Sequence, residues 1–344
     1  MKTIFIPIFQ GVEAKNILRT DIFKILVAQK KFKIVLIVSN NKKKMYFQKE
    51  FLADNIYYEI FDNFINPRFN RFFIFLKYVL IETKTMDAKR LLWLSEDKNY
   101  FKFYLRFILN RLFSFQKVRK FVRYLDWILI KDSNFKELFD KYNPDLVFLA
   151  HLFGEEEISM LRQARARRTR IVGLINSWDK LTSRCMIRLL PDKMVVHNNI
   201  MKAEATKHAD MKEKNIEVVG IPHYDVYVNQ KPSNKKYFFN KLGVDVNKKL
   251  LFFCPLGKHY SDVDIEVLNI ISDFQLKKLI SHNVQIVVRF PPNDIMDTDQ
   301  ILNKDKIIFY QPGKIFTLSG KRRVDWDMNG GEIQYCFRHI HFAL

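Results

Sequence analysis

The stretch Ile171–Asp225 contains three short apolar runs, and each of them stops at a small polar loop. In order, they are IVGLI at 171–175 before NSWDKLTS, MVV at 194–196 before HNN, and IEVV at 216–219 before GIPHYD. Short β-branched runs separated by helix-length segments are typical of parallel strands. Because ligands of open parallel sheets bind beyond the carboxyl ends of the strands, we expect a functional site in these loops.

The same alternation of strand and helix continues along the 344 residues, a length that fits two domains. Further strands of a first sheet are expected at 2–9, 33–39, 56–61 and 145–151, with helices at 14–29, 42–54 and 155–168. Strands of a second sheet are expected at 249–254, 284–289 and 306–310, with a helix at 263–282. The polar composition of 229–236 places the boundary there. We therefore predict an α/β protein with Rossmann-like domains over 1–228 and 229–344.

The chain is strongly basic, with 58 Lys and Arg against 37 Asp and Glu. Residues 66–131, predicted as a helical insertion, hold fifteen of these cations, five acidic residues and sixteen aromatic residues. Two interpretations stay open: the aromatic residues form the core face of packed helices, or they form an amphipathic surface that lies against an anionic membrane. No recognised nucleic-acid motif accompanies the charge, so we expect no nucleic-acid partner.

Cysteine content and apolar runs indicate the compartment. Cys185, Cys254 and Cys336 have no metal-ligand spacing and cannot all pair with one another, which suits a reducing environment. The apolar run at 3–9 lacks a cleavage-site pattern and is predicted to be a first strand rather than a signal peptide. No uncharged apolar run reaches the roughly 18–20 residues that span a bilayer. We predict a cytoplasmic protein, peripheral at the inner face of the plasma membrane if the insertion binds lipid.

Five segments carry a resemblance to a known family: PDLVF at 144–148, NSWD at 176–179, PDKMVV at 191–196, VGIPHYD at 219–225 and VRFPPND at 288–294. Together they resemble GT-B glycosyltransferase-like proteins of bacterial surface-polysaccharide biosynthesis. More distantly, the chain is similar to the CDP-glycerol glycerophosphotransferases that make teichoic acids. The resemblance covers about residues 2–328 and implies two Rossmann-like domains that face each other across a cleft, with the acceptor on the first and the nucleotide donor on the second.

The chain departs from the glycerophosphotransferases at two places. It has Trp178-Asp179-Lys180 where that family has Trp-His-Gly, and Arg289 followed by Phe-Pro-Pro where the family has Arg-x-His-Pro. Both family histidines are absent. The resemblance therefore favours an inverting, metal-independent transferase that moves a sugar from a nucleotide diphosphate to a cell-surface polysaccharide or lipid-linked acceptor, with the nucleotide sugar as co-substrate and no other cofactor.

Two alternatives to sugar transfer stay open. One is an enzyme of the CDP-glycerol glycerophosphotransferase type. The other is a non-catalytic homologue that binds a nucleotide sugar or only the membrane surface. A nucleotide-sugar epimerase of the same fold would need a pair of catalytic carboxylates, and the sequence offers no such pair.

Glycosyl transfer needs a base for the acceptor proton and positive charge for the departing diphosphate. Asp179 follows a predicted strand and is the first candidate base, although Asp is also a favoured helix cap; Glu13 and His151 are the next candidates. Trp178 can stack on a sugar or close the domain core. The candidate substrate-binding residues are Gly11, Asn176, Ser177, Trp178, Gly220, Pro222 and Asp225.

The candidate residues for the nucleotide phosphates are Lys258, Arg289 and Asn293. Arg is suited to bidentate phosphate contact, and pairing of Arg289 with an aspartate near Asp294 is the alternative. His197 and His223 are isolated candidates for which structural hydrogen bonds are the simpler role. The carboxylates and histidines do not cluster at ligand spacing in the sequence, so no metal is expected.

The end of the chain lacks the pattern that the resemblance requires. A GT-B second domain needs roughly two more strand-helix units after 306–310, but residues 329–344 show no further strand. We expect an incomplete second domain and a truncated or frame-disrupted terminus. Zinc binding by Cys336, His339 and His341 is not expected, because a tetrahedral site takes four ligands at a recurring spacing.

Overall fold

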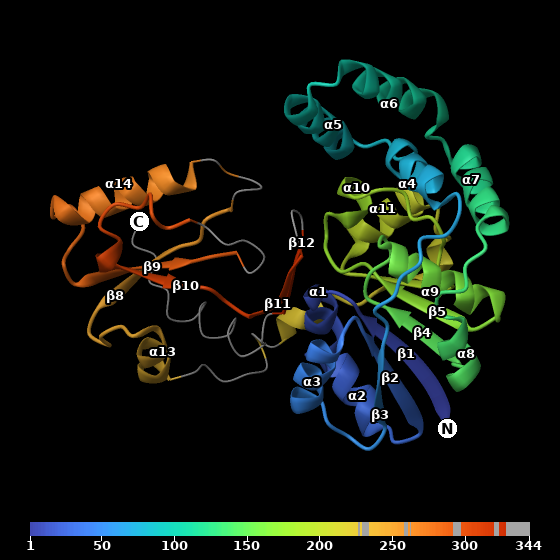
Figure 1. Ribbon diagram of the computed structural model, residues 1–344, viewed down its shortest axis with the longest axis horizontal. Helices are drawn as coiled ribbons and strands as arrows, with labels where there is room; N and C mark the ends of the chain where they lie inside the picture. Colours follow the sequence, from blue (N-terminus) through green and yellow to red (C-terminus); the bar gives the residue numbers. More distant parts are fainter. Residues whose placement is uncertain are drawn as a thin grey trace. The chain divides into compact units, whose positions relative to one another are not determined.

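The computed structural model describes residues 1–225, 228, 234–257, 261, 263–291, 297–319 and 323–327 (Figure 1). By internal contacts the chain divides into two compact units. The first unit contains Met1–Phe9 and Asn16–Pro222, and the second contains Gln10–Lys15 and His223–Leu344. The boundary predicted at residue 228 stays a prediction.

The first unit is built on a seven-stranded sheet in which every pair of neighbouring strands is parallel. The strands are β1 Lys2–Ile8, β2 Phe32–Val38, β3 Ile56–Ile60, β4 Leu146–Leu149, β5 Arg170–Leu174, β6 Lys193–Val196 and β7 Ile216–Val218. Their order in the sheet is β3-β2-β1-β4-β5-β6-β7, so the order reverses between β1 and β4. This confirms the predicted strands and the α/β fold class, with a Rossmann-like sheet.

Helices follow the strands of this sheet (Figure 1). They are α2 Asp21–Ala28, α3 Asn41–Glu50, α8 Lys136–Tyr142, α9 Glu155–Ala166, α10 Lys180–Ser183 and α11 Asn199–Ala209, with a short 3-10 helix at Glu213–Asn215. The predicted single helix 14–29 is wrong. A π-helical segment ends at Leu18, and α2 begins only after Thr20, whose backbone is extended and whose hydroxyl donates to the Ile17 carbonyl oxygen at 2.7 Å. Local hydrogen bonding by Thr competes with a continuous helix.

The predicted helical insertion lies between β3 and β4. It comprises α4 Asn70–Val79, α5 Lys84–Asp97, α6 Tyr100–Phe113 and α7 Gln116–Leu129 (Figure 1). A small apolar core joins these helices to the segment after α10, through Phe73, Leu80, Val122 and Met186 among others. The insertion is therefore packed onto the first unit rather than being a free arm.

Buried ion pairs fix the insertion to the sheet domain. The Asp126 carboxylate on α7 accepts hydrogen bonds from Arg162 on α9 at 2.5 Å and from Arg188 at 2.6 Å. The Glu155 carboxylate at the start of α9 accepts from Lys77 on α4 and from Arg188, both at 2.7 Å. The basic residues of the insertion are thus partly structural, because Lys77 pairs with Glu155, and Arg119 and Arg123 pair with Asp210, inside the first unit.

The second unit contains a parallel sheet in the order β10-β9-β8, with β8 Lys249–Phe253, β9 Val284–Arg289 and β10 Ile307–Tyr310. Its helices are α1 Gly11–Glu13, α13 Lys235–Leu242, α14 Asp264–Leu276 and 3-10 turns at Pro222–Tyr224, on the boundary, and Lys304–Lys306. Neighbouring residues of β9 enter two different apolar clusters, Val287 with Phe239 and Val288 with Leu268. Both faces of this sheet are therefore covered, as in parallel sheets generally.

The sequence did not predict the hairpin of the second unit. β11 Lys314–Ser319 pairs antiparallel with β12 Arg323–Asp327. Polar residues interrupt the apolar ones in both strands, a pattern weaker than the continuous apolar runs of the parallel strands. Among the described residues, no helix is both long enough and apolar enough to cross a bilayer.

Candidate functional site

The loop after β5 holds Asp179 in a network of hydroxyl groups. Its carboxylate accepts hydrogen bonds from the hydroxyl of Ser177 and, at 2.7 Å, from the hydroxyl of Ser183. Burial opposes ionisation, but the two hydroxyl hydrogen bonds and the charge of Lys180 outweigh it and lower the pKa of Asp179. The carboxylate is therefore ionised at neutral pH. Its side chain makes no capping hydrogen bond to α10, so the capping alternative is wrong.

Trp178, immediately before Asp179, is 74% exposed. An indole in the hydrophobic core would be buried, so the alternative that Trp178 closes the domain core is wrong. The residue adjoins Asp179 in the sequence, and an exposed aromatic face is suited to stacking on a sugar or an apolar chain.

Two buried polar side chains stand at the ends of neighbouring strands. Leu174 of β5 pairs with Val195 of β6, so Asn176 and His197 occupy equivalent positions two residues further along. Both are less than 7% exposed, and neither the Asn176 amide nor the His197 ring nitrogens have a hydrogen-bond partner among the described residues. Burial lowers the pKa of His197, which is therefore neutral at neutral pH. Buried polar groups without partners are rare in folded proteins, which marks this pair as a candidate ligand contact.

The His151 ring accepts hydrogen bonds from the backbone just before α9. Its Nδ1 accepts the backbone N–H groups of Gly154 at 3.2 Å and Phe153 at 3.4 Å, so the ring proton is on Nε2. A carboxylate oxygen of Glu157 lies 3.6 Å from Nδ1, beyond hydrogen-bond distance. A Cβ on Gly154 would lie 2.0 Å from that carboxylate, which explains the glycine. His151 is buried and already bonded, so it is a weaker base candidate than Asp179.

Glu13 and Gly11 belong to the short helix α1. The Glu13 carboxylate accepts the backbone N–H of Gln10 at 2.9 Å and is 1% exposed. Gly11 begins the same turn, is buried and does not have a positive φ. Both residues therefore form a tight turn, and their predicted roles as base and acceptor contact stay predictions.

The motif from Gly220 to Asp225 contains the division between the two units. Gly220 has φ +77°, a left-handed conformation that favours glycine, and its N–H donates to the His197 carbonyl oxygen at 3.1 Å. Pro222 is buried in the first unit, and Asp225 is exposed in the second. The glycine thus has a structural reason, because it turns the chain beside the end of β6.

Arg289 ends β9 in the second unit, as the sequence predicts. Burial and then the charge of Arg289 lower the pKa of Lys15, which belongs to the same unit. Arg289 also opposes the burial that raises the pKa of Cys254, the residue after β8. Positive charge therefore gathers at the carboxyl edge of this sheet. Lys258 and Asn293 lie outside the described residues, as do Asp294, Cys336, His339 and His341.

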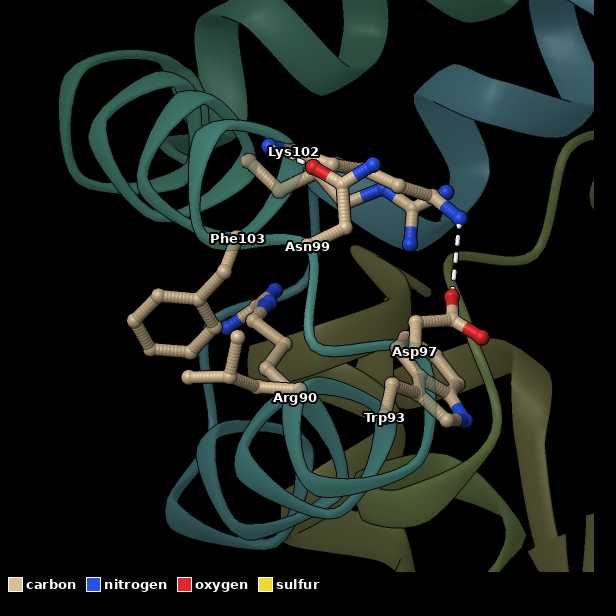
Figure 2. A pocket seen from close by; sticks show the side chains of 8 residues that line it. Arg90, Trp93, Asp97, Asn99, Lys102 and Phe103 are labelled. Carbon is tan, nitrogen blue, oxygen red and sulfur yellow. Dashed lines mark hydrogen bonds and ion pairs between the residues drawn. The ribbon is translucent and has the colours of Figure 1, made fainter.

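A pocket between α5 and α6 lies within the insertion (Figure 2). Three of its four charged side chains are already bonded: Lys102 pairs with Asp97 at 3.0 Å, and Arg90 donates to the carbonyl oxygens of Tyr78 and Ile81. The guanidinium of Arg106 packs over the ring of Trp93. None of the lining residues follows a strand of the sheet, so the pocket is separate from the candidate site.

Known proteins that are similar to this chain share its α/β fold with parallel sheets. Residues 164–315 match the model of the family described as CDP-Glycerol:Poly(glycerophosphate) glycerophosphotransferase. The structure resembles S. aureus MnaA in complex with UDP, with 12% identity, a TM-score of 0.50, and coverage of 91% of this chain and 69% of that chain. The chain has a GT-B-like fold. No curated protein sequence matches it.

Two further structures are similar. A putative UDP-N-acetylglucosamine 2-epimerase from Listeria monocytogenes has 11% identity, a TM-score of 0.50, and coverage of 91% of this chain and 69% of that chain. A glycosyltransferase from Rickettsia africae has 16% identity, a TM-score of 0.41, and coverage of 90% and 68%. At identities this low, the two structures with a TM-score of 0.50 show a shared fold and nothing more. The family match adds a distant resemblance to glycerophosphotransferases, over a segment that includes the Asp179 loop and ends in β11.

Proposed function

We propose that this chain transfers a sugar from a nucleotide diphosphate donor to a hydroxyl of a cell-surface polysaccharide or lipid-linked acceptor, with inversion and without a catalytic metal. The observation that carries the proposal is the ionised Asp179 carboxylate at the end of β5, held by Ser177 and Ser183 beside the exposed Trp178. A carboxylate in that state can accept the proton of an acceptor hydroxyl.

The chemistry is a single displacement. The acceptor oxygen attacks the anomeric carbon, the bond from that carbon to the diphosphate oxygen breaks, and the acceptor proton moves to the Asp179 carboxylate. The nucleoside diphosphate leaves with the bonding electron pair, so its negative charge increases during the reaction. Arg289, at the end of β9 in the second unit, supplies positive charge of the kind that a departing diphosphate needs.

Transfer of glycerophosphate is the second candidate function, because the matched family carries that activity in its description. Trp178-Asp179-Lys180 replaces the Trp-His-Gly of that family, which favours sugar transfer. A non-catalytic homologue that binds a nucleotide sugar is the outcome if a donor binds and no transfer follows. S. aureus MnaA is bound to UDP in its structure, which supports a uridine nucleotide as the first donor to try.

The donor is tested by isothermal titration of the whole chain with UDP, CDP and GDP. We expect one of the three to bind, and Arg289→Ala to weaken that binding by about tenfold or more, as for a charge-assisted phosphate contact. Lys304→Ala is the matched control, since Lys304 is an exposed cation of the same unit paired with Asp299. Preference for CDP would favour glycerophosphate transfer, and equal affinity of the parent and Arg289→Ala would remove Arg289 from the site.

The proposal includes a peripheral position on an anionic membrane, through the outer faces of α6 and α7. On α6, Phe101, Tyr104 and Ile108 are 80%, 57% and 53% exposed, and their spacing places them on one helix face. Exposed apolar side chains gathered in this way mark an interaction surface.

Charge favours lipid as the partner of this surface. On α7 the exposed Lys117 and Lys120 share a face with Phe121 and Tyr124. Neither lysine has an ion pair among the described residues. Neither α6 nor α7 exposes an acidic residue, since the single one, Asp126, is buried. A second copy of the chain would bring like charges together, whereas anionic headgroups would neutralise them.

A further inference from the structure

Three cations gather around the Asp179 loop, all within the first unit. Lys180 and Arg184 stand at the two ends of the short helix α10, one turn apart. Lys89 comes from α5 of the insertion, and its ammonium group donates to the Ser183 carbonyl oxygen at 2.6 Å. The insertion thereby places a cation beside a loop that is almost a hundred residues away in sequence.

The position of Lys89 is fixed by a second contact. The hydroxyl of Thr83, which caps the start of α5, donates to the Thr182 carbonyl oxygen at 2.6 Å. These two hydrogen bonds hold α5 against α10. They use the carbonyl oxygens of Thr182 and Ser183 and involve neither the Lys180 nor the Arg184 side chain.

The charges of this cluster are not balanced. Among the described residues, Asp179 is the one carboxylate whose charge acts on Lys89 and Lys180, and it accepts its own side-chain hydrogen bonds from serine hydroxyls. Among the described residues, the Lys180 ammonium and the Arg184 guanidinium have neither an ion pair nor a side-chain hydrogen bond. Burial, and then repulsion from Arg184, lower the pKa values of Lys89 and Lys180. Elsewhere in the insertion, the buried Arg119 and Arg123 both pair with the Asp210 carboxylate, so this fold otherwise neutralises such groups.

We propose that Lys89, Lys180 and Arg184 form a subsite for a phosphate or diphosphate group carried by the acceptor. A phosphate dianion would balance the excess charge, an arginine can contact two of its oxygens, and lysines act as point charges beside it. The exposed Trp178 ring lies next in sequence to Asp179 and suits the sugar or lipid part that such a phosphate carries. The role as an acceptor subsite rests on the proposed transfer, but anion binding can be measured without any donor.

The first test is lysine labelling of the unmodified chain. The acylation rates of Lys89, Lys180 and the exposed control Lys212 are measured by mass spectrometry with and without inorganic pyrophosphate, at constant ionic strength. At a pyrophosphate concentration about ten times Kd, we expect labelling of Lys89 and Lys180 to fall about tenfold, because the bound fraction is protected, while Lys212 is unchanged. Equal rates at all three lysines with and without pyrophosphate would overturn the subsite.

The second test uses Lys180→Gln and Arg184→Gln, with Lys212→Gln as the control that removes the same charge elsewhere. Among the described residues, neither side chain makes a hydrogen bond or an ion pair, so we expect the variants to fold. We expect the pyrophosphate affinity by isothermal titration to fall about tenfold for each, as for one charged contact, and to be unchanged for the control. If either variant fails to fold, the labelling of the unmodified chain decides. Parental affinity in both folded variants would contradict the proposal.

The source of the phosphate is distinguished with farnesyl diphosphate. If farnesyl diphosphate binds more tightly than pyrophosphate, and Trp178→Ala abolishes the difference, the acceptor phosphate is lipid-linked. If the two ligands bind with equal affinity, the acceptor is a soluble glycan phosphate. A chain that binds pyrophosphate here but transfers nothing keeps the subsite and overturns the proposed transfer. Transfer at parental kcat/KM in Lys180→Gln and Arg184→Gln overturns the subsite and keeps the transfer.

Discussion

The guanidinium group of Arg119 donates two hydrogen bonds to the carboxylate of Asp210, one at 2.8 Å and one at 2.6 Å. Arg119 belongs to α7 of the insertion, and Asp210 ends α11 of the sheet domain. Arg123, one turn further along α7, donates to the same carboxylate at 2.6 Å. A bidentate, buried contact of this kind is geometrically specific. The contact fixes α7 of the insertion to the sheet domain. The same insertion places Lys89 beside the Asp179 loop.

Removing the Asp210 charge should destabilise the first unit. In Asp210→Asn two buried guanidinium groups lose their counter-ion, and breaking a buried ion pair from one side costs about 3–5 kcal/mol. We expect the free energy of unfolding, measured by urea denaturation, to fall by that amount. Glu217→Gln is the control, because the Glu217 pair with Lys193 is exposed and contributes at most about 1 kcal/mol. Similar losses in the two variants would contradict a structural role for the buried pair.

The same pair predicts how stability depends on pH. Burial opposes ionisation of Asp210, but hydrogen bonds from Arg119 and Arg123 outweigh it and lower the pKa of Asp210. The ordinary pKa of Asp is about 3.9, so the contribution of the pair is complete above about pH 5 and is lost as pH falls through 4 and below. We expect the difference in unfolding free energy between the parent and Asp210→Asn to shrink over that range. A difference that stays constant from pH 6 to pH 3 would show that Asp210 is not the titrating group.

Binding to anionic vesicles should depend on the exposed face of α6 and α7. Each Lys near an anionic surface contributes about 1 kcal/mol, so replacing Lys117 and Lys120 together by Gln should weaken binding by roughly thirtyfold. The measurement is co-sedimentation with anionic and neutral vesicles at two salt concentrations, and the control is the double replacement of Lys212 and Lys214 by Gln. Equal binding of the parent to anionic and neutral vesicles would contradict the proposed membrane surface.

His197→Phe should separate a functional role from a structural one. The ring nitrogens of His197 have no partner among the described residues, so an apolar ring should leave the free energy of unfolding unchanged or raise it by about 1 kcal/mol. His151→Phe is the contrasting variant. It leaves the N–H groups of Phe153 and Gly154 unpaired and should cost about 1–3 kcal/mol. If His197 contacts substrate, its variant keeps stability and loses transfer; a large loss of stability would show a structural partner instead.

The central strands were predictable because their residues are buried on both faces of a parallel sheet. Ile34–Val38 of β2 are all fully buried, and a run of that kind is visible in sequence without any tertiary information. The break at Thr20 was not predictable from apolar spacing, since the spacing continues through it and only a local hydrogen bond stops the helix. The β11–β12 hairpin was missed for the converse reason, because its alternating pattern is short and partly polar.

The candidate site was predictable in its location but not in its partners. Strand ends pointed to the Asp179 loop, and the structure places Asp179, Trp178 and Asn176 there. Which carboxylate each Lys or Arg pairs with depends on the tertiary structure. Nothing in the sequence predicts that Arg119 pairs with Asp210, 91 residues away, or that Arg184 has no ion pair among the described residues. The same holds for His197, whose isolation from hydrogen-bond partners becomes visible only when the surrounding strands are packed.

The last prediction concerns Asp179, which carries the mechanism. Asp179→Asn keeps the size of the side chain, and its amide oxygen still accepts a hydrogen bond from Ser177 or Ser183, so folding should change little. The amide cannot accept the acceptor proton, and loss of a general base typically lowers the rate by about 10²–10⁴-fold. The assay is the initial rate of transfer with the donor that titration identifies, and Ser183→Ala is the control, because it removes one hydrogen bond and keeps the carboxylate. An Asp179→Asn chain that works within a fewfold of the parent would show that the base lies elsewhere, with Glu13 and His197 the next residues to replace.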